Sequence, residues 1–366
     1  MKLLTKTEHA ATTRRGASVA ERPWAPASGG RLVVVSMIVL GVAALVAASQ
    51  GSVAIPIATL IQILISKLGV VQVEQSWPQS YETILLAIRL PRILLAGLVG
   101  AALGAAGAAY QGLFRNPLAD PYLIGVASGA GLGATIALLL PATALVSSVA
   151  LVPLMAFCGA LSTVTIAYGV ARIGRTLPIP TLLLAGIAIA SLASSTTSFL
   201  MAMSGEELRA IFAWLMGSFA LSSWQRALGA LPYVAVSCGV LLIMARSLNV
   251  LQVGEEEARQ LGLNTERTKL ILVVFSSLAT AAAVSVSGLI GFVGLVVPHI
   301  ARLLGGPDYR TVLPVSTVLG GAFLICADTL ARTLLSPVEM PVGIVTAFTG
   351  APFFLFLLRQ RKQELF

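Results

Sequence analysis

The sequence predicts an all-α polytopic membrane protein with about ten transmembrane helices and both termini in the cytoplasm. Three observations predict this class: hydrophobic residues make up 57% of the 366 residues, charged residues make up only 11%, and the apolar residues gather in long runs. Soluble proteins carry about a quarter charged residues, and outer-membrane barrels show short alternating strands instead of long apolar runs. Both of those classes are therefore excluded.

Residues 1–31 come first, and they are polar and rich in Arg and Lys. They lack the apolar stretch that closely follows the basic residues of a signal peptide. We therefore expect a disordered cytoplasmic tail. Residues 32–366 are expected to form a single transmembrane domain.

Apolar runs follow one another from residue 32 to the end of the chain. About 20 apolar residues cross a bilayer, and runs of that order bounded by charges, Pro or Gly mark the spans. We place the spans at 32–50, 84–113, 119–140, 147–171, 179–203, 224–245, 268–287, 290–304, 311–335 and 341–358.

The distribution of basic residues indicates the orientation of these spans. Ten spans return the C-terminus to the side of the N-terminus, and most of the 24 Lys and Arg residues then fall on that side. Cytoplasmic loops carry such an excess, so both ends are predicted inside. The basic residues that fall outside are Lys67, Arg89, Arg92, Arg209, Arg226 and Arg332.

Two segments on the outer side are not predicted to span. Residues 204–223 have a polar start and a short apolar core, which is typical of a re-entrant or interfacial helix. Residues 51–82 are expected to form a fairly long outer loop. Neither segment is apolar enough, over enough residues, to cross the bilayer.

Small residues recur at helical-neighbour spacing in the second and third spans. Such faces let helix backbones approach closely in lipid, where no hydrophobic force drives helices together. We favour close packing over the alternative that these glycines line a translocation path. The residues are Gly97, Gly100, Gly104 and Gly107 in one span and Gly125, Gly129 and Gly133 in the other.

The long cytoplasmic loop 246–267 contains a short polar helix. Glutamates in its first turn suit the positive end of the helix dipole, and Gly262 can end the helix in a left-handed conformation. The loop is either a solvated connector or a docking site for a cytoplasmic partner. Its key residues are Gly254, Glu255, Glu256, Glu257, Ala258, Leu261 and Gly262.

The chain lacks the residues that would let it power transport or catalyse a reaction alone. Mid-span ionisable residues, which proton or sodium coupling needs, are few, and Asp328, Arg332 and Glu339 lie near one end of the spans. No lysine follows a glycine, so there is no phosphate-binding loop, and no H-E-x-x-H motif supports a metalloprotease. We expect no catalytic residue, no metal site, no cofactor and no nucleic-acid partner.

Several blocks resemble the FecCD/BtuC-type permease subunits of type II ABC importers, which take up iron-siderophore complexes, haem and cobalamin. The blocks occur in the family's order over most of the chain. They are the R-L-P-R block at 89–92, GAAYQGLFRNPLADPYLIGVASGAG at 107–131, GEEEARQLG at 254–262, GLIGFVGLVVPHIARLLG at 288–305, the stretch 327–332, and Glu339 with the PVGIVTAFTGAPFF that follows it.

The resemblance implies a homodimer of ten-span permeases in the bacterial cytoplasmic membrane, surrounded by membrane lipid. Two copies of a separate cytoplasmic ATPase would bind ATP and Mg²⁺ and receive coupling helices near 249–266. A periplasmic or lipid-anchored binding protein would deliver the substrate. A ferric siderophore is expected first, then cobalamin, then haem. The alternative is a stand-alone secondary transporter or channel.

The resemblance also assigns a role to three outer arginines. Family permeases use arginines on the outer face to accept glutamates of the binding protein, and the matching positions here are Arg89, Arg92 and Arg332. The alternatives are anchoring to lipid headgroups or an internal pair of Arg332 with Asp328, four residues earlier on one helix.

Overall fold

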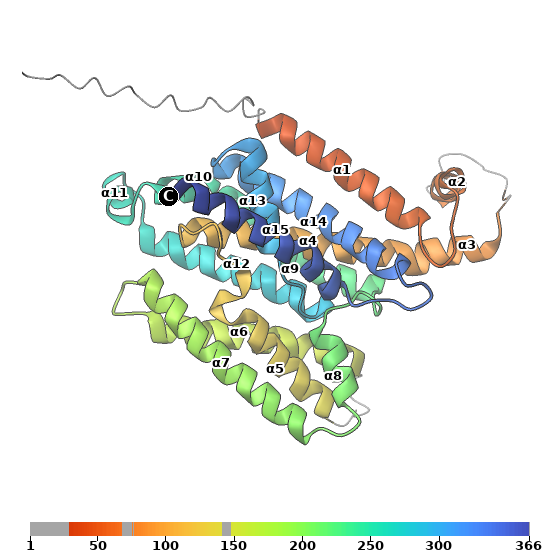
Figure 1. Ribbon diagram of the computed structural model, residues 1–366, viewed down its shortest axis with the longest axis horizontal. Helices are drawn as coiled ribbons and strands as arrows, with labels where there is room; N and C mark the ends of the chain where they lie inside the picture. Colours follow the sequence, from red (N-terminus) through yellow and green to blue (C-terminus); the bar gives the residue numbers. More distant parts are fainter. Residues whose placement is uncertain (1–28, 68–74, 76, 141–147, 366) are drawn as a thin grey trace, which may run out of the picture.

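The computed structural model describes residues 29–67, 75, 77–140 and 148–365. Most of these residues are helical, and none of them forms a named strand, which confirms the all-α prediction (Figure 1). The helices are α1 (Gly29–Ser49), α2 (Ile57–Lys67), α3 (Gln79–Thr83), η1 (Ile84–Arg89), α4 (Leu90–Leu113), η2 (Pro121–Ile124), α5 (Val126–Leu139), α6 (Ser148–Ala171), α7 (Ile179–Met203), α8 (Leu208–Leu215), α9 (Trp224–Ile243), α10 (Ala245–Gln252), α11 (Glu255–Gln260), α12 (Thr265–Ser287), α13 (Val293–Gly305), α14 (Tyr309–Thr333) and α15 (Val342–Leu365).

The ten predicted spans correspond in order to α1, α4, α5, α6, α7, α9, α12, α13, α14 and α15. Within the described residues, seven helical stretches are long and apolar enough to cross a membrane. The other three predicted spans are shorter apolar helices, namely α5, α13 and the apolar part of α15, which runs from 342 to 356. The predicted tail lies almost entirely outside the described residues.

The third predicted span is shorter than expected because its first residues form a different structure. The Asp120 side chain accepts a hydrogen bond from the Tyr122 N–H and starts the 3₁₀ helix η2. Gly125 then adopts a φ of 90°, a left-handed conformation that interrupts helical geometry and that glycine adopts without steric cost. The α-helix α5 therefore begins only at Val126.

The second span contains a turn of π-helix immediately before a proline. Pro91 has no N–H to donate and would crowd the carbonyl four residues earlier in a regular α-helix. The wider π turn of η1 precedes that position, and the whole stretch from Gln79 to Leu113 remains one continuous helix. Arg89 and Arg92 lie at this transition.

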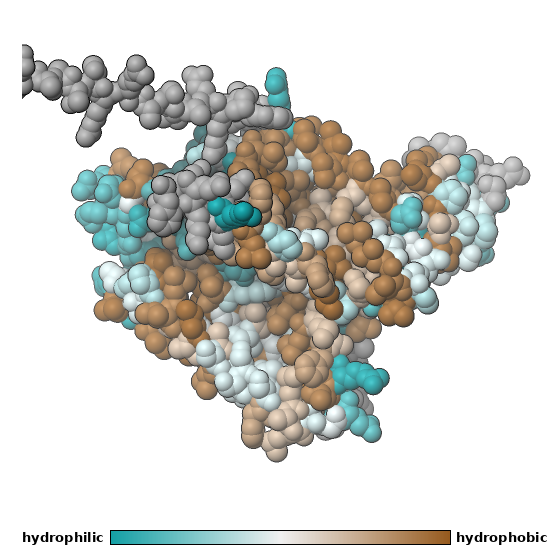
Figure 2. All heavy atoms as spheres, viewed as in Figure 1, coloured by the Kyte–Doolittle hydropathy of each residue, from teal (hydrophilic) through white to brown (hydrophobic). Residues whose placement is uncertain are grey.

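The helices run between two ends of the bundle. Figure 1 shows α10, α11 and the end of α15 at one end, and α2, α3 and the loop after α14 at the other. We call these the inner end and the outer end, after the predicted topology. Figure 2 shows hydrophilic residues at both ends of the bundle, with hydrophobic side chains over much of the helical surface between them.

The central helix of the bundle is α4, which is buried along most of its length. It packs against α9, α12, α13 and α14, whereas α5, α6 and α7 pack together as a group beside α12. Small residues permit this: a Cβ on Gly100 would overlap the carbonyl of Gly320, and a Cβ on Gly107 would overlap Gly294. The backbones of α4, α13 and α14 therefore touch directly.

One helix in the outer loop was not predicted. Residues 57–67 form α2, with Leu60 and Ile63 buried, and Lys67 forms an ion pair with Glu82. The available signal was Pro56 at the helix start followed by apolar residues three apart, in a stretch too short to span. The expected loop 51–82 therefore includes a short helix.

Candidate docking and coupling sites

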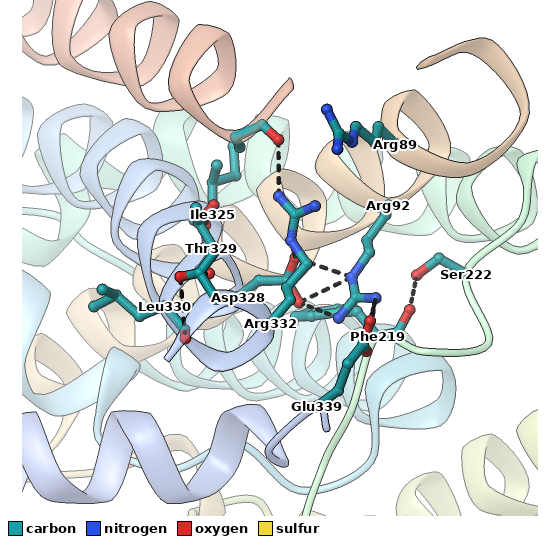
Figure 3. Close-up of polar contacts among 12 residues, drawn as sticks. Arg89, Arg92, Phe219, Ser222, Ile325, Asp328, Thr329, Leu330, Arg332 and Glu339 are labelled. Carbon is teal, nitrogen blue, oxygen red and sulfur yellow. Dashed lines mark hydrogen bonds and ion pairs between the residues drawn. The ribbon is translucent and has the colours of Figure 1, made fainter. Parts of the chain in front are cut away.

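A cluster of charged residues joins α4 to α14 at the outer end. Arg92 Nε lies 3.0 Å from both Asp328 carboxylate oxygens, and its Nη2 lies 2.8 Å from Oδ1. Its Nη1 donates to the Glu339 carboxylate at 2.9 and 3.1 Å. Figure 3 shows Arg92 between these two acids. One guanidinium therefore uses all three of its nitrogens on carboxylates from α14 and the loop that follows it.

The other two arginines of the cluster bind backbone carbonyls at the end of α1. Arg89 donates to Ala48 O at 2.6 Å, to Ser49 O at 3.2 Å and also to Val53 O. Arg332 donates to Ala47 O at 2.8 Å, and its Nε lies 3.4 Å from Asp328 Oδ2. The last carbonyls of a helix lack intrahelical partners and carry partial negative charge. Two guanidinium groups satisfy them here.

The three arginines line a common cavity of about 150 Å³ at the outer end. Each is buried, with 3%, 7% and 8% of Arg89, Arg92 and Arg332 exposed, whereas the Glu339 side chain is 42% exposed. Three positive and two negative groups meet, so the cluster carries a net positive charge. The contact between Arg332 and Asp328, which we gave as an alternative to docking, is present. Docking of a binding protein on these arginines stays a prediction.

The inner end carries two short helices, α10 and α11, separated by Gly254. Gly254 has a φ of 139° and Gly262 a φ of 85°, so glycines bracket α11 as the sequence predicts. Glu255, Glu256 and Glu257 occupy its first turn. Ala258 is buried against the bundle, whereas Leu261 is 70% exposed beside charged residues.

A buried lysine links α11 to the loop that leads into α7. Lys269 Nζ lies 2.7 Å from both Glu255 and Glu266, and it donates to Leu177 O at 2.8 Å. Glu266 in turn accepts the Leu177 N–H at 2.8 Å. Arg259 lies 3.1 Å from Glu255 and 3.2 Å from Glu266. The start of α7 and helix α11 are thus held by one charged cluster.

Helix α10 is linked to two further helices. Gln252 donates to the carbonyl of Gly112 at the end of α4, at 2.9 Å. Asn249 donates to Asp308 and accepts the Tyr309 N–H at 2.9 Å, at the start of α14. Burial raises the pKa of Asp308, but hydrogen bonds from Arg310 N–H and Asn249 outweigh it and hold the pKa below its usual value. Asp308 is therefore ionised at neutral pH.

The seven glycines singled out in the sequence differ in their surroundings. Gly104 lies against Ser316, and Gly129 and Gly133 lie against Gly159 and Met155 of α6. A Cβ on Gly97 would instead make only an ordinary contact with Ile325. Five of the seven, Gly100, Gly104, Gly107, Gly129 and Gly133, therefore meet another backbone, and Gly125 serves the left-handed turn.

Two polar residues that the sequence argument did not single out join the loop before α5 to α13. Gln111 donates to Ala119 O at 3.3 Å and to Gly294 O at 3.2 Å, and it accepts from Arg302. The Tyr122 hydroxyl donates to Ile290 O at 2.9 Å. The sequence feature that could have drawn attention to Gln111 is its position as a polar residue among small apolar ones. Within the described ranges, no cluster of His, Cys, Asp or Glu could hold a metal ion.

A family model and several known proteins match this chain. The FecCD transport family matches residues 37–360. The cobalamin import system permease protein BtuC of Halobacterium salinarum is 50% identical over 285 residues, covering 78% of this chain and 76% of the relative. The hemin transport system permease protein HmuU of Yersinia pestis is 46% identical over 283 residues, covering 76% of this chain and 84% of the relative.

A solved structure also matches. A metal-chelate type ABC transporter in an inward-facing conformation superposes with a TM-score of 0.78 at 30% identity, over 90% of this chain and 99% of that one. The described helices therefore share the fold of that transporter.

Proposed function

The chain belongs to the FecCD transport family, and from this we propose that it is the permease subunit of an ATP-binding-cassette importer in a bacterial cytoplasmic membrane. Its all-α fold is that of type II importer permeases. We further propose a homodimer with two copies of a separate ATPase, which would bind ATP and Mg²⁺, and a periplasmic or lipid-anchored binding protein. Both termini of the permease would lie in the cytoplasm.

One observation carries the coupling role. The pair α10 and α11 lies at the inner end, and α11 is largely exposed. Helix α10 is hydrogen-bonded to the end of α4 and the start of α14, and α11 shares a charged cluster with α12 and the start of α7. A force applied to this pair therefore reaches four membrane helices through polar contacts. We propose that the ATPase docks on α10 and α11, with Leu261 as its apolar anchor, and tilts those helices during alternating access.

The outer cavity supports the docking role proposed for Arg89, Arg92 and Arg332. It is lined by three guanidinium groups and by one carboxylate, that of the partly exposed Glu339. Asp328, which contacts Arg92, is the other carboxylate of the cluster, so positive groups still outnumber negative ones. A carboxylate of the binding protein would complete the charge balance. Arg89 is the proposed first contact, because its partners named above are carbonyls, whereas Arg92 and Arg332 already contact acids.

We propose a macrocyclic metal chelate as the substrate, with cobalamin first and haem second, ahead of a ferric siderophore. The relatives named for cobalamin and hemin are 50% and 46% identical to this chain, whereas one named for Fe(3+)-citrate, YfmE of Bacillus subtilis, is 38% identical. This reverses the order expected above, which rested on how common each substrate is in the family.

The test is uptake into liposomes that contain the permease, its ATPase and its binding protein. Cobalamin, haemin and a ferric siderophore are supplied in parallel, with and without ATP. We expect ATP-dependent accumulation of one of the three chelates, and we expect that chelate to be cobalamin. Accumulation that persists without the ATPase and collapses with an ionophore would instead establish a secondary transporter.

A further inference from the structure

Two cavities meet at the outer part of α6, α9 and α12. The first, of about 300 Å³, runs between α6 and α9 over α12, and the second, of about 380 Å³, lies beneath α8. Both are lined by Pro153 of α6, Arg226 of α9 and Val286 of α12. The two cavities therefore share one wall, and a guanidinium group forms part of that wall.

The first cavity has the shape of a groove along the helices. It is lined by Leu154 and Phe157 of α6 and by Gly229 and Tyr233 of α9. The rings of Phe157 and Tyr233 meet across it with centroids 5.4 Å apart. Ser223 and Gln225 line its other end, near the start of α9. The groove thus runs from a polar end to an aromatic end.

The position of the groove indicates the environment to which it opens. Leu154 and Tyr233 are 56% and 48% exposed on the outside of a helical bundle, so this part of the groove faces the bilayer. Trp224 begins α9, and its indole N–H donates to Leu86 O at 2.9 Å. Tryptophan concentrates at membrane interfaces. Arg226 therefore lies close to the level of the outer lipid headgroups.

The described part of the lining is apolar apart from a few hydroxyl and amide groups and a single charge. Among the described residues that line the two cavities, Arg226 is the one charged side chain, and no carboxylate lines either cavity. A positive group at the polar end of an apolar, bilayer-facing groove complements an amphiphile with an anionic head and a hydrocarbon tail.

We propose that this groove is a binding site for an anionic phospholipid of the outer leaflet. The phosphate lies at Arg226, and an acyl chain runs along the groove between α6 and α9 toward Phe157 and Tyr233. A free phosphate would leave the apolar groove unfilled, so the lipid is the occupant that uses both features. This site is separate from the proposed docking and coupling sites, and its test does not depend on transport.

The experiment measures lipid bound to the purified full-length protein. Nanodiscs contain phosphatidylglycerol and phosphatidylcholine in equal amounts, and native mass spectrometry counts the lipids retained after release. The variants are Arg226→Gln, which removes the charge, Arg226→Lys, which keeps it, and Gly229→Leu, which fills the groove. A Cβ at Gly229 meets no atom within 4 Å, so the leucine side chain starts in open space.

The matched controls are Arg209→Gln, an exposed arginine of α8, and Gly239→Leu, a glycine of α9 that also has open space and lines neither cavity. We expect retained phosphatidylglycerol to fall at least about tenfold in Arg226→Gln and Gly229→Leu and to stay unchanged in Arg226→Lys and both controls. Equal retention of phosphatidylcholine, or full retention in Arg226→Gln at an unchanged melting temperature, would overturn the proposal.

Discussion

Arg92 of α4 and Asp328 of α14 form a buried pair in which two guanidinium nitrogens contact the carboxylate at 2.8 to 3.0 Å. Both residues lie below 9% exposure, and Asp328 also receives Arg332 from its own helix. Ionised groups within a membrane protein require such partners, because hydrocarbon cannot solvate them. The pair therefore fixes α4 against α14 at the outer end.

Removing one side of this pair is expected to destabilise the protein. The variant Asp328→Asn leaves two buried guanidinium groups without that carboxylate, and breaking a buried pair costs about 3–5 kcal/mol. Thermal unfolding in detergent measures the loss. Glu339→Gln is the control, because the Glu339 side chain is 42% exposed and water screens its pair. An equal loss of thermal stability in Asp328→Asn and Glu339→Gln would contradict the expectation that the buried pair matters more.

Two glycines on α4 are expected to differ sharply when replaced by alanine. A Cβ at Gly100 would overlap the backbone of Gly320 on α14, so Gly100→Ala forces the helices apart and costs about 1–3 kcal/mol or more. Gly97→Ala meets only Ile325 at an ordinary distance and should keep or slightly raise the melting temperature. Comparable destabilisation by both would show that the close approach is unimportant.

Charge reversal at Arg89 is expected to weaken association with the binding protein. Arg89→Glu replaces an attractive contact with a repulsive one, so affinity should fall at least about tenfold at low salt and less at high salt. Surface plasmon resonance over a salt series measures this. The exposed Arg209→Glu is the matched control, and melting curves report whether α1 remains attached. Unchanged affinity in a folded Arg89→Glu protein would remove the assignment.

The exposed leucine of the coupling loop is expected to be needed for the ATPase. Leu261→Asp places a charge where an apolar side chain is 70% exposed, and burying that charge at an interface is unfavourable. Co-purification with the ATPase should fall at least about tenfold. Gln260→Asp, at the neighbouring exposed position, should retain it. A normal yield of the complex between Leu261→Asp and the ATPase would indicate that the loop only connects two helices and does not dock the ATPase.

Lys269 is expected to affect coupling more than assembly. Lys269→Met keeps the apolar stem but releases Glu255, Glu266 and Leu177, so α11 and the start of α7 lose their shared contact. ATP hydrolysis by the assembled complex should persist while uptake per ATP falls severalfold. Glu256→Gln is the control, because its contact with Arg259 is long, at 3.9 Å, and exposed. Equal coupling ratios would refute this role.

The order and class of the helices followed from the sequence because apolar length and flanking charges are local signals. The short helix α11 between Gly254 and Gly262 could be predicted for the same reason. The contact of Arg332 with Asp328 was foreseeable from their spacing on one helix. By contrast, Arg92 meets Asp328 across 236 positions, and no local pattern specifies which distant helix a guanidinium contacts.

The shortness of α5 illustrates a second limit. Residues 121–140 contain no charged side chain, so a span was the natural prediction for 119–140, yet Asp120 starts a 3₁₀ helix and Gly125 adopts a left-handed conformation. Hydrophobicity reports neither change of backbone conformation. Similarly, Gln111 and Tyr122 are single polar residues whose partners belong to α13 and the loop before it. Their importance depends on tertiary contacts that periodicity does not encode.

The two arginines at the end of α1 come from distant parts of the chain. The last carbonyls of α1 need donors once the helix has left the translocon, and Arg89 follows Ala48 after 41 residues, so a first cap becomes available early in synthesis. Arg332, which donates to Ala47, lies 285 residues after it in the chain. The end of α1 is therefore held by one residue close in the chain and by one almost at the other end of it, so its attachment depends on nearly the whole length of the polypeptide.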